Sequence, residues 1–211
     1  MDFPKAICVV GTHANVGKTF VASMLTLGLR GLYWKPIQCG VSPQTDTEDA
    51  KELTGLPQEH FLREAFLFQS NVSPLLESLP IEIEELVPEK LPEEYTTLII
   101  ESPEGLMMPL NEHQSFLDFL TRFHLPVLFV VKTEEKEISS TLLALEKIQE
   151  RDLPLIGIAL NGDPNSEFRH TLESLVSSAP IFEIPYLIKK SPDTLFDCYG
   201  KTFGDKLAIA S

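Results

Sequence analysis

Basic side chains are scarce in this sequence of 211 residues. Its 17 Lys and Arg stand against 31 Asp and Glu, which gives a formal net charge of −14. A nucleic-acid-binding surface needs a basic face that displaces counterions from phosphates, and an anionic membrane attracts clusters of Lys and Arg. We therefore expect neither nucleic acid nor a membrane among the partners. A small anionic ligand is compatible with this charge, because a pocket needs only a few well-placed cations.

Long apolar runs are missing as well. The first apolar run, residues 6–10, is far shorter than the roughly 20 residues of a membrane helix, and no later run approaches that length. The first residues also lack the basic stretch and long apolar stretch of an export signal. The three cysteines, Cys8, Cys39 and Cys198, show no Cys-x-x-Cys or metal-binding spacing, which favours a reducing compartment. We therefore expect a soluble, cytoplasmic protein.

Hydrophobic residues make up 43% of the chain, which is enough for a core without disulfides or metals. Short apolar runs alternate with amphipathic stretches, a pattern typical of strand–helix–strand units around a parallel sheet. Strands are expected at residues 6–10, 32–34, 96–100, 126–131, 155–160 and 181–184. Helices are expected at residues 17–30, 115–123, 138–150, 166–177 and 205–210. The pattern predicts one α/β domain over residues 1–211, with a mostly parallel sheet and helices on both faces.

The strongest motif is Gly11-Thr-His-Ala-Asn-Val-Gly17-Lys18-Thr19. It follows an expected strand and opens an expected helix, which is the context of a phosphate-binding loop (P-loop). Glycine lets the backbone approach phosphate oxygens, and the helix N-terminus offers unpaired N–H groups. Lys18 is predicted to reach the β- and γ-phosphates, and the Thr19 hydroxyl to bind Mg²⁺. Five residues separate the two glycines where the common loop has four, so the alternative is a glycine-rich turn with an incidental Lys-Thr pair.

Further charged residues follow two expected strands. Lys35 ends the second one, at the edge of the sheet where ligands bind, and could stabilise a transferring phosphoryl group. An ordinary surface lysine is its alternative. Glu101 follows the third strand, where an acidic residue holds Mg²⁺ directly or through water. Asp46, Glu48 and Asp49 could each add a carboxylate, and spacing alone does not separate them from charges that only favour a helix N-terminus.

Together these motifs resemble those of the dethiobiotin synthetase family. The family's long phosphate loop, Gly-Thr-x-x-x-Val-Gly-Lys-Thr, matches residues 11–19, and its Lys-Pro-x-x-x-Gly segment matches residues 35–40. Weaker matches keep the same order along the chain. They are Asp49-Ala50, Ser73-Pro74, Glu101, Pro109-Leu110, Asn161 and Ile184-Pro185-Tyr186-Leu187. The resemblance covers roughly residues 6–190.

The resemblance implies an enzyme that uses ATP and Mg²⁺. Members of the family carboxylate 7,8-diaminononanoate with CO₂ and close the product to dethiobiotin, in biotin biosynthesis, as homodimers. By position, Lys18 and Lys35 would neutralise the phosphates and the carbamate, while Thr19, Asp49 and Glu101 would hold Mg²⁺. The other positions that the resemblance assigns are the nucleotide contacts Asn15, Val16, Gly17, Asn161 and Pro185, and the substrate contacts Thr12 and Cys39.

Two loops depart from the family pattern. The family's Gly-Ala-Gly-Gly after the acidic strand end is here Ser102-Pro103-Glu104-Gly105, where proline removes an N–H donor and Glu104 adds a negative charge. Residues 134–140 replace the loop that would hold the carboxylate of the diamine, and they bring further glutamates. A relative with another amine acceptor and a non-catalytic nucleotide binder are therefore alternatives. A nucleotide-switched regulatory ATPase is a third, although residues 12–14 lack its signature lysine.

Overall fold

The centre of the protein is a parallel β-sheet. The computed structural model describes residues 5–40, 43–70, 74–88, 91, 95, 97–176, 179–187 and 189–207. Within these residues, six strands pair in the order β2-β5-β1-β6-β7-β8, and all neighbours run parallel. The strands are β1 (Lys5–Gly11), β2 (Leu32–Trp34), β5 (Thr97–Glu101), β6 (Val127–Lys132), β7 (Leu155–Asn161) and β8 (Ile181–Ile184). This sheet confirms the predicted α/β class.

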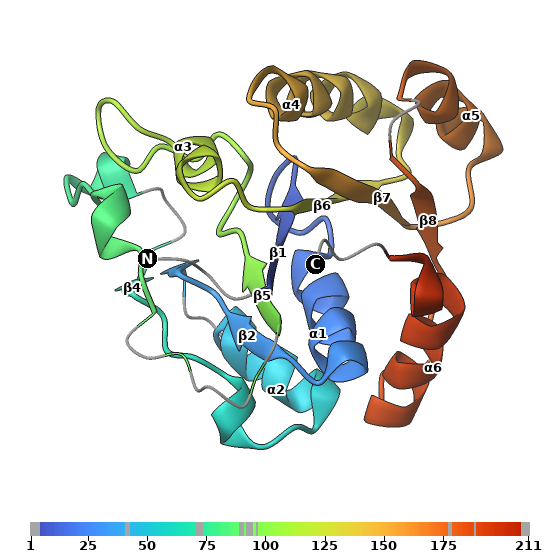
Figure 1. Ribbon diagram of the computed structural model, residues 1–211, viewed down its shortest axis with the longest axis horizontal. Coiled ribbons are helices and arrows are strands. Elements are labelled where there is room, and N and C mark those ends of the chain that lie inside the picture. Colours follow the sequence, from blue (N-terminus) through green and yellow to red (C-terminus); the bar gives the residue numbers. More distant parts are fainter. Residues whose placement is uncertain are drawn as a thin grey trace.

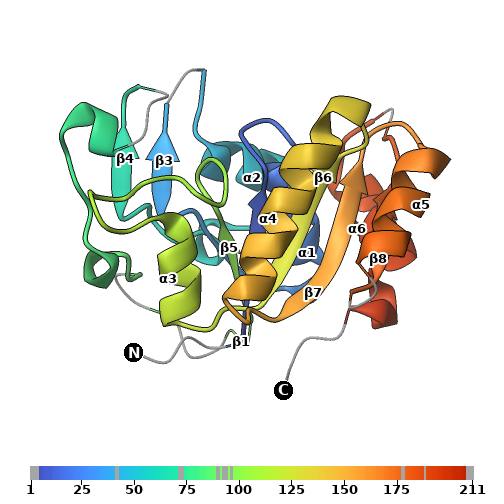
Figure 2. The same ribbon diagram turned by 90° about the horizontal axis from the view of Figure 1, so that it is seen from above.

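Helices cover both faces of the sheet (Figures 1 and 2). The α-helices are α1 (Lys18–Leu29), α2 (Asp46–Thr54), α3 (Phe116–Arg122), α4 (Ile138–Glu150), α5 (Ser166–Leu175) and α6 (Pro192–Thr202). Short 3₁₀ turns are η1 (Gln58–His60), η2 (Pro74–Glu77), η3 (Ile83–Glu85), η4 (Glu135–Glu137) and η5 (Gly204–Lys206). Helices α1, α2 and α6 share one face, and α3, α4 and α5 share the other.

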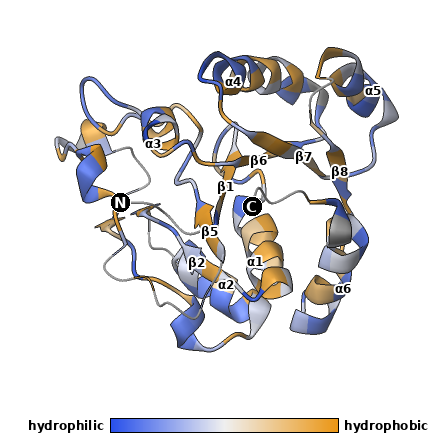
Figure 3. Ribbon diagram, in the orientation of Figure 1, coloured by the Kyte–Doolittle hydropathy of each residue, from blue (hydrophilic) through white to orange (hydrophobic). Residues whose placement is uncertain are grey.

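The central strands are apolar throughout because both of their faces are buried. Successive side chains of a strand point to opposite faces, so β1 contributes side chains to two separate hydrophobic cores. Cys8 and Val10 pack under α3, α4 and α5, whereas Ile7 and Val9 pack under α1 and α6. Figure 3 shows the hydrophobic colour concentrated in the central strands and α1, while α4, α5 and α6 carry mixed colours.

The C-terminal part of the chain differs from the sequence prediction. The sequence predicts a helix at residues 205–210. This prediction is wrong for residues 205–207, which form the end of the 3₁₀ turn η5 and the residue after it. The last helix is instead α6, which the sequence analysis missed. Its N-cap is Ser191, whose hydroxyl accepts a hydrogen bond from the Thr194 N–H, and the helix begins at Pro192. Serine at the N-cap followed by proline is a local helix-start signal.

A small second sheet was also missed. It pairs β3 (Ile37–Cys39) in parallel with β4 (Phe66–Phe68). Strands of three residues are too short to show the alternation of apolar and polar residues that identifies a strand in a sequence.

The predicted long elements agree with the structure to within about two residues. Some predicted positions lie outside the described residues: Ser73, Thr96, Ser177 and residues 208–210. Among the described helices, none is long and apolar enough to cross a membrane.

The topology places a crevice at one edge of the sheet. From β1 the chain moves through α1 to β2 on one side, and from β5 it moves through α3 to β6 on the other. Ligands of open α/β sheets bind at the carboxyl ends of the strands, where the strand order reverses. The carboxyl ends of β1, β2 and β5 meet at this point, so the segments after them form the candidate site.

Candidate active site

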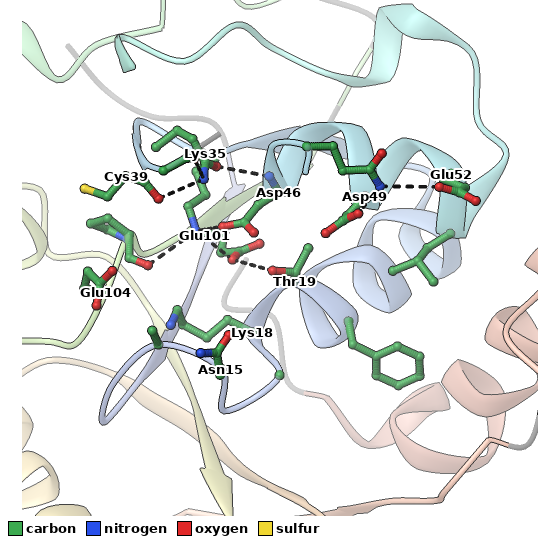
Figure 4. A pocket seen from close by; sticks show the side chains of 18 of the residues that line it. Asn15, Lys18, Thr19, Lys35, Cys39, Asp46, Asp49, Glu52, Glu101 and Glu104 are labelled. Carbon is green, nitrogen blue, oxygen red and sulfur yellow. Dashed lines mark hydrogen bonds and ion pairs between the residues drawn. The ribbon is translucent and has the colours of Figure 1, made fainter. Parts of the chain in front are cut away.

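A pocket of about 910 Å³ opens at the carboxyl ends of β1, β2 and β5. Its walls are the loop after β1, the N-terminal turns of α1 and α2, and the segments after β3 and β5 (Figure 4). Residues that line it include Ala14, Asn15, Gly17, Lys18, Thr19, Lys35, Cys39, Asp46, Asp49, Glu101 and Glu104. The fold thus gathers most of the predicted nucleotide, metal and substrate residues in one cavity.

The phosphate-binding loop is held in a tight cradle. Gly17 has a φ of +98°, which side chains rarely adopt, and its carbonyl accepts the N–H of Val21 in the first turn of α1. From the end of β7, Asn161 donates its side-chain amide to the Val16 carbonyl at 2.8 Å. On the other side, a Cβ on Gly105 would lie 2.5 Å from the carbonyl oxygen of Thr12. The segment after β5 therefore packs directly on the loop, and only glycine fits there.

Glu101 is the centre of the polar network in the pocket. Its side chain is only 1% exposed. Its Oε1 atom accepts hydrogen bonds from the Thr19 hydroxyl and from the Lys35 ammonium group, both at 2.9 Å. Its Oε2 atom accepts one from the Tyr33 hydroxyl at 2.7 Å. Burial, and then the charge of Glu101, raise the pKa of Tyr33 well above its usual range, so that this hydroxyl stays a donor.

Lys35 is buried between two carboxylates. Its Nζ atom pairs with Glu101 and with Asp46 at the start of α2, and the backbone carbonyls of Ser102 and Pro103 lie 3.4 Å away. Burial alone would lower the pKa of Lys35, but Glu101 and Asp46 outweigh it and raise the pKa above its usual value. Lys35 is therefore a permanent cation in the pocket, and the alternative of an ordinary surface lysine is wrong.

Lys18 has a different environment. Its side chain is buried, and its Nζ atom donates to the carbonyl of His13 at 2.9 Å, within the loop itself. Burial, followed by repulsion from the Lys35 ammonium group, lowers the pKa of Lys18 to about 8. The pocket thus holds one cation that stays charged and one that loses its proton just above neutral pH.

The donor set suits Mg²⁺ held jointly by protein and phosphate. Thr19 and Glu101 offer a hydroxyl and a carboxylate beside the loop. Within the described residues, no three His, Cys, Asp or Glu side chains form a closed metal cage. Mg²⁺ is commonly bound by one or two carboxylates, with phosphate oxygens and water completing its shell. The residues present therefore fit a magnesium ion that arrives with a nucleotide.

The structure separates the three acidic candidates at the start of α2. Glu48 is exposed and caps the helix, because its carboxylate accepts the N–H of Thr45 at 2.7 Å. Asp46 pairs with Lys35, while the carboxylate of Asp49 accepts a hydrogen bond from the Gln44 amide. Asp46 and Asp49 both line the pocket (Figure 4). Glu48 does not line the pocket, and the choice of Asp49 as metal ligand stays a prediction.

Four predicted contacts do not line the main pocket: Thr12, Val16, Asn161 and Pro185. Thr12 does not line it, and its buried hydroxyl has no hydrogen-bond partner in the described part of the chain. Asn161 supports the loop from behind through Val16. Pro185 lines a separate cavity of about 310 Å³, beside Asn165. Their roles as substrate and nucleotide contacts stay predictions.

Two of the glutamates in the loop after β6 have basic side chains beside them. Glu134 lies 2.8 Å from the ammonium group of Lys136 and 3.8 Å from that of Lys132. Glu137 is buried, and its carboxylate lies 3.0 Å from Nε2 of His13 in the phosphate loop. Each of these glutamates therefore faces a basic group.

Sequence reasoning missed Tyr33, although a signal was present. Side chains two positions apart in a strand share a face, and Tyr33 precedes Lys35 by two residues. The apolar appearance of the segment hid this relation, because tyrosine is common in buried strands.

These features define a class: a P-loop α/β protein with a nucleotide-type pocket. A model described as an AAA domain matches residues 5–194. Two solved structures share the fold at 16% identity: a nucleotide-binding protein in complex with ADP from Archaeoglobus fulgidus (TM-score 0.52, 92% of this chain and 86% of that one), and a ParA family ATPase from Chlorobium tepidum (TM-score 0.54, 96% and 91%).

Curated relatives narrow the class to a family. The ATP-dependent dethiobiotin synthetase BioD of Rhodopseudomonas palustris strain BisB5 is 33% identical over 93% of both chains. The proteins of the same name from Nitrobacter hamburgensis and Brucella melitensis are each 31% identical, again over 93% of both chains. The chain belongs to the family of ATP-dependent dethiobiotin synthetases, as its motifs predict.

Proposed function

We propose that this protein is an ATP- and Mg²⁺-dependent ligase that converts 7,8-diaminononanoate and CO₂ to dethiobiotin. One amine of the substrate carries CO₂ as a carbamate, and a carbamate oxygen attacks the γ-phosphorus of ATP, which releases ADP. The second amine then attacks the carbonyl carbon, and phosphate leaves as the cyclic urea forms. The observation that carries the proposal is the burial of Lys35 between Glu101 and Asp46, beside a long phosphate loop, in a chain of this family.

The residues of the pocket suit this chemistry, because phosphoryl transfer mainly requires positioning and charge stabilisation. Lys18 and the N–H groups at residues 15–17 bind the phosphates. Lys35 stabilises the negative charge that moves from the carbamate to the γ-phosphate. Thr19 and Glu101, with Asp49, hold Mg²⁺, which when bound neutralises charge on the phosphate oxygens.

The outer contacts complete the proposal. Cys39 lines the substrate end of the pocket, and Thr12 offers a buried hydroxyl without a partner in the described part of the chain. Asn161 and Pro185 contact the adenine, which occupies the cavity beside Asn165.

We also propose a single domain over residues 1–211, which acts in the cytoplasm as a homodimer without nucleic acid or membrane partners. The charge balance and the family resemblance support these statements.

The deciding assay incubates the protein with ATP, Mg²⁺, bicarbonate and diaminononanoate, and measures dethiobiotin by mass spectrometry. We expect dethiobiotin and ADP in equal amounts, and neither product in reactions that lack the diamine. Calorimetric titration with ATP is run on the same preparation. Measurable ATP binding without any dethiobiotin would overturn the assignment in favour of a nucleotide-binding relative with another acceptor or none.

Raising the pH from 7 to 9 is expected to weaken ATP binding. The pKa of Lys18 is lowered to about 8, and ATP binds the protonated form. A rise in pH removes this proton, so the apparent affinity falls about ten-fold between pH 7 and pH 9. Calorimetry at several pH values measures the effect. Lys18→Ala is the control, and its weaker binding should not change over this range. A wild-type affinity that is constant with pH contradicts the prediction.

A further inference from the structure

Tyr33 is a buried polar side chain to which the proposed reaction gives no role. It is fully buried, and its ring packs against Phe61 with the centroids 5.9 Å apart. Buried hydroxyl groups need a hydrogen-bond partner, and backbone carbonyls most often supply it. Here the partner is a carboxylate that lines the pocket, Glu101, at 2.7 Å. This choice of partner ties a core residue of β2 to the polar site.

The contact divides the two oxygens of Glu101 between the core and the pocket. Tyr33 lies in β2 and is paired with Ile99 of the neighbouring strand β5, so that its hydroxyl reaches the end of β5 from the core side. Thr19 and Lys35 both donate to the other oxygen, Oε1. The terminal torsion of a glutamate side chain is soft. The hydroxyl of Tyr33 therefore restrains the carboxylate from the core side, while Thr19 and Lys35 hold its other oxygen from the pocket side.

We propose that Tyr33 is a positioning residue for the metal end of the pocket. Its hydroxyl fixes Oε2 of Glu101 and leaves Oε1 facing the place where the Thr19 hydroxyl and the nucleotide phosphates meet. Without this hydrogen bond, Glu101 turns and accepts Thr19 on one oxygen and Lys35 on the other. Both hydrogen bonds are then harder to break when Mg²⁺ binds. The inference rests on the proposed function only in naming Mg²⁺ and ATP as the ligands.

The test is Tyr33→Phe, which removes one oxygen atom and keeps the ring. ATP binding is measured by calorimetry with Mg²⁺ and with EDTA. We expect affinity in EDTA within two-fold of wild type, and affinity with Mg²⁺ about ten-fold weaker, the value of one hydrogen bond to a charged group. Tyr199→Phe is the matched control. Tyr199 packs on α1 at Gly28 and does not line the pocket, so neither affinity should change.

A second pair of variants shows whether Tyr33 acts through Glu101. In a Glu101→Ala background, which has no side-chain acceptor for the Tyr33 hydroxyl, the further change Tyr33→Phe should alter the affinity for Mg²⁺ and ATP by less than two-fold, because residues that work as a unit are not additive. Full additivity overturns the proposal. So does a loss in Tyr33→Phe that is the same in Mg²⁺ and in EDTA, since that pattern reports a general disturbance of the pocket.

Two more measurements test whether Tyr33 has a purely structural role. Phe61→Leu loosens the ring packing of Tyr33 but keeps its hydroxyl, so it should lower the unfolding temperature without a selective loss of affinity in Mg²⁺. A selective loss in this variant contradicts the proposal. If Tyr33→Phe does not fold, a crystal structure of the wild-type chain with Mg²⁺ and a non-hydrolysable ATP analogue decides. The Tyr33 hydroxyl must then lie within about 3.2 Å of Glu101, and a hydroxyl that has left the carboxylate overturns the inference.

The two proposals fail in different ways. If the wild-type chain binds ATP with Mg²⁺ but forms no dethiobiotin, the proposed function is wrong and the binding test of Tyr33 still stands. If dethiobiotin forms and Tyr33→Phe binds ATP with Mg²⁺ as wild type does, only the role of Tyr33 is wrong.

Discussion

Replacing Lys35 with alanine is expected to lower dethiobiotin formation about 10³-fold, the cost of losing a preorganised cation at a developing charge. ATP affinity should change far less, because in the proposed mechanism Lys18 and the loop N–H groups bind the phosphates in the ground state. The loss should therefore fall on kcat rather than on the KM for ATP. Steady-state kinetics at saturating diaminononanoate measure both constants. Unchanged turnover in Lys35→Ala would remove this residue from the mechanism.

The same variant has a consequence for stability. Removing Lys35 leaves Glu101 and Asp46 without their shared cation, and breaking a buried ion pair commonly costs about 3–5 kcal/mol. Mg²⁺ should restore part of this loss, so thermal unfolding should show a larger stabilisation by Mg²⁺ in Lys35→Ala than in wild type. Lys147→Ala is the matched control, since Lys147 pairs only with the exposed Glu150 on α4 in the part of the chain that the structure describes. It should change neither turnover nor the response to Mg²⁺.

The sequence was sufficient to predict that the phosphate loop, Lys35 and Glu101 lie together. A phosphate loop is contiguous, so residues 11–19 carry both its motif and its strand–loop–helix context. Lys35 and Glu101 could be placed beside it because parallel strands end at the same edge of a sheet. Both inferences need only local sequence and the class of fold.

The remaining contacts depend on side-chain directions that spacing does not set. Asp46 faces Lys35 because α2 is fixed at its first turn: Gln38 accepts the N–H of Asp46 at 3.1 Å, and Glu48 caps the helix. The pairing of Glu137 with His13 joins residues 124 positions apart. Such contacts follow from how elements pack, and a sequence without its fold leaves them open.

The elements that were missed have short or weak patterns. Helix α6 buries only Leu195, Cys198 and Thr202, so its apolar stripe is narrow although its N-terminal cap is a clear signal. The helix nevertheless packs on α1, where the Tyr199 ring fills the space above Gly28. Tertiary packing of this kind, rather than the amphipathic pattern, supplies most of the stability of such a helix.

Gly17→Ala is expected to abolish tight nucleotide binding. At a φ of +98°, alanine is strained by roughly 1–2 kcal/mol, and its Cβ would collide with the side-chain amide of Asn161. Either the loop or the amide must move, and the hydrogen bond from Asn161 to the Val16 carbonyl is lost with it. ATP affinity should fall about 100-fold, which is the expected loss when two N–H groups of the displaced loop no longer donate hydrogen bonds to the phosphates. Calorimetry measures this loss.

The control is Gly200→Ala in α6, where a Cβ meets no atom within 4 Å. Alanine is favoured over glycine inside a helix by up to about 1 kcal/mol, so this variant should unfold at the same or a slightly higher temperature and bind ATP as wild type does.

The double variant Gly17→Ala/Asn161→Ala separates the two causes of the loss, which are the collision with the amide and the backbone strain. If the collision dominates, removing the amide should recover part of the unfolding temperature lost in Gly17→Ala, because the two residues are in contact and their effects are not additive. If nothing is recovered, backbone strain at Gly17 alone accounts for the loss. Wild-type ATP affinity in Gly17→Ala would show that the φ of +98° is not required for phosphate binding.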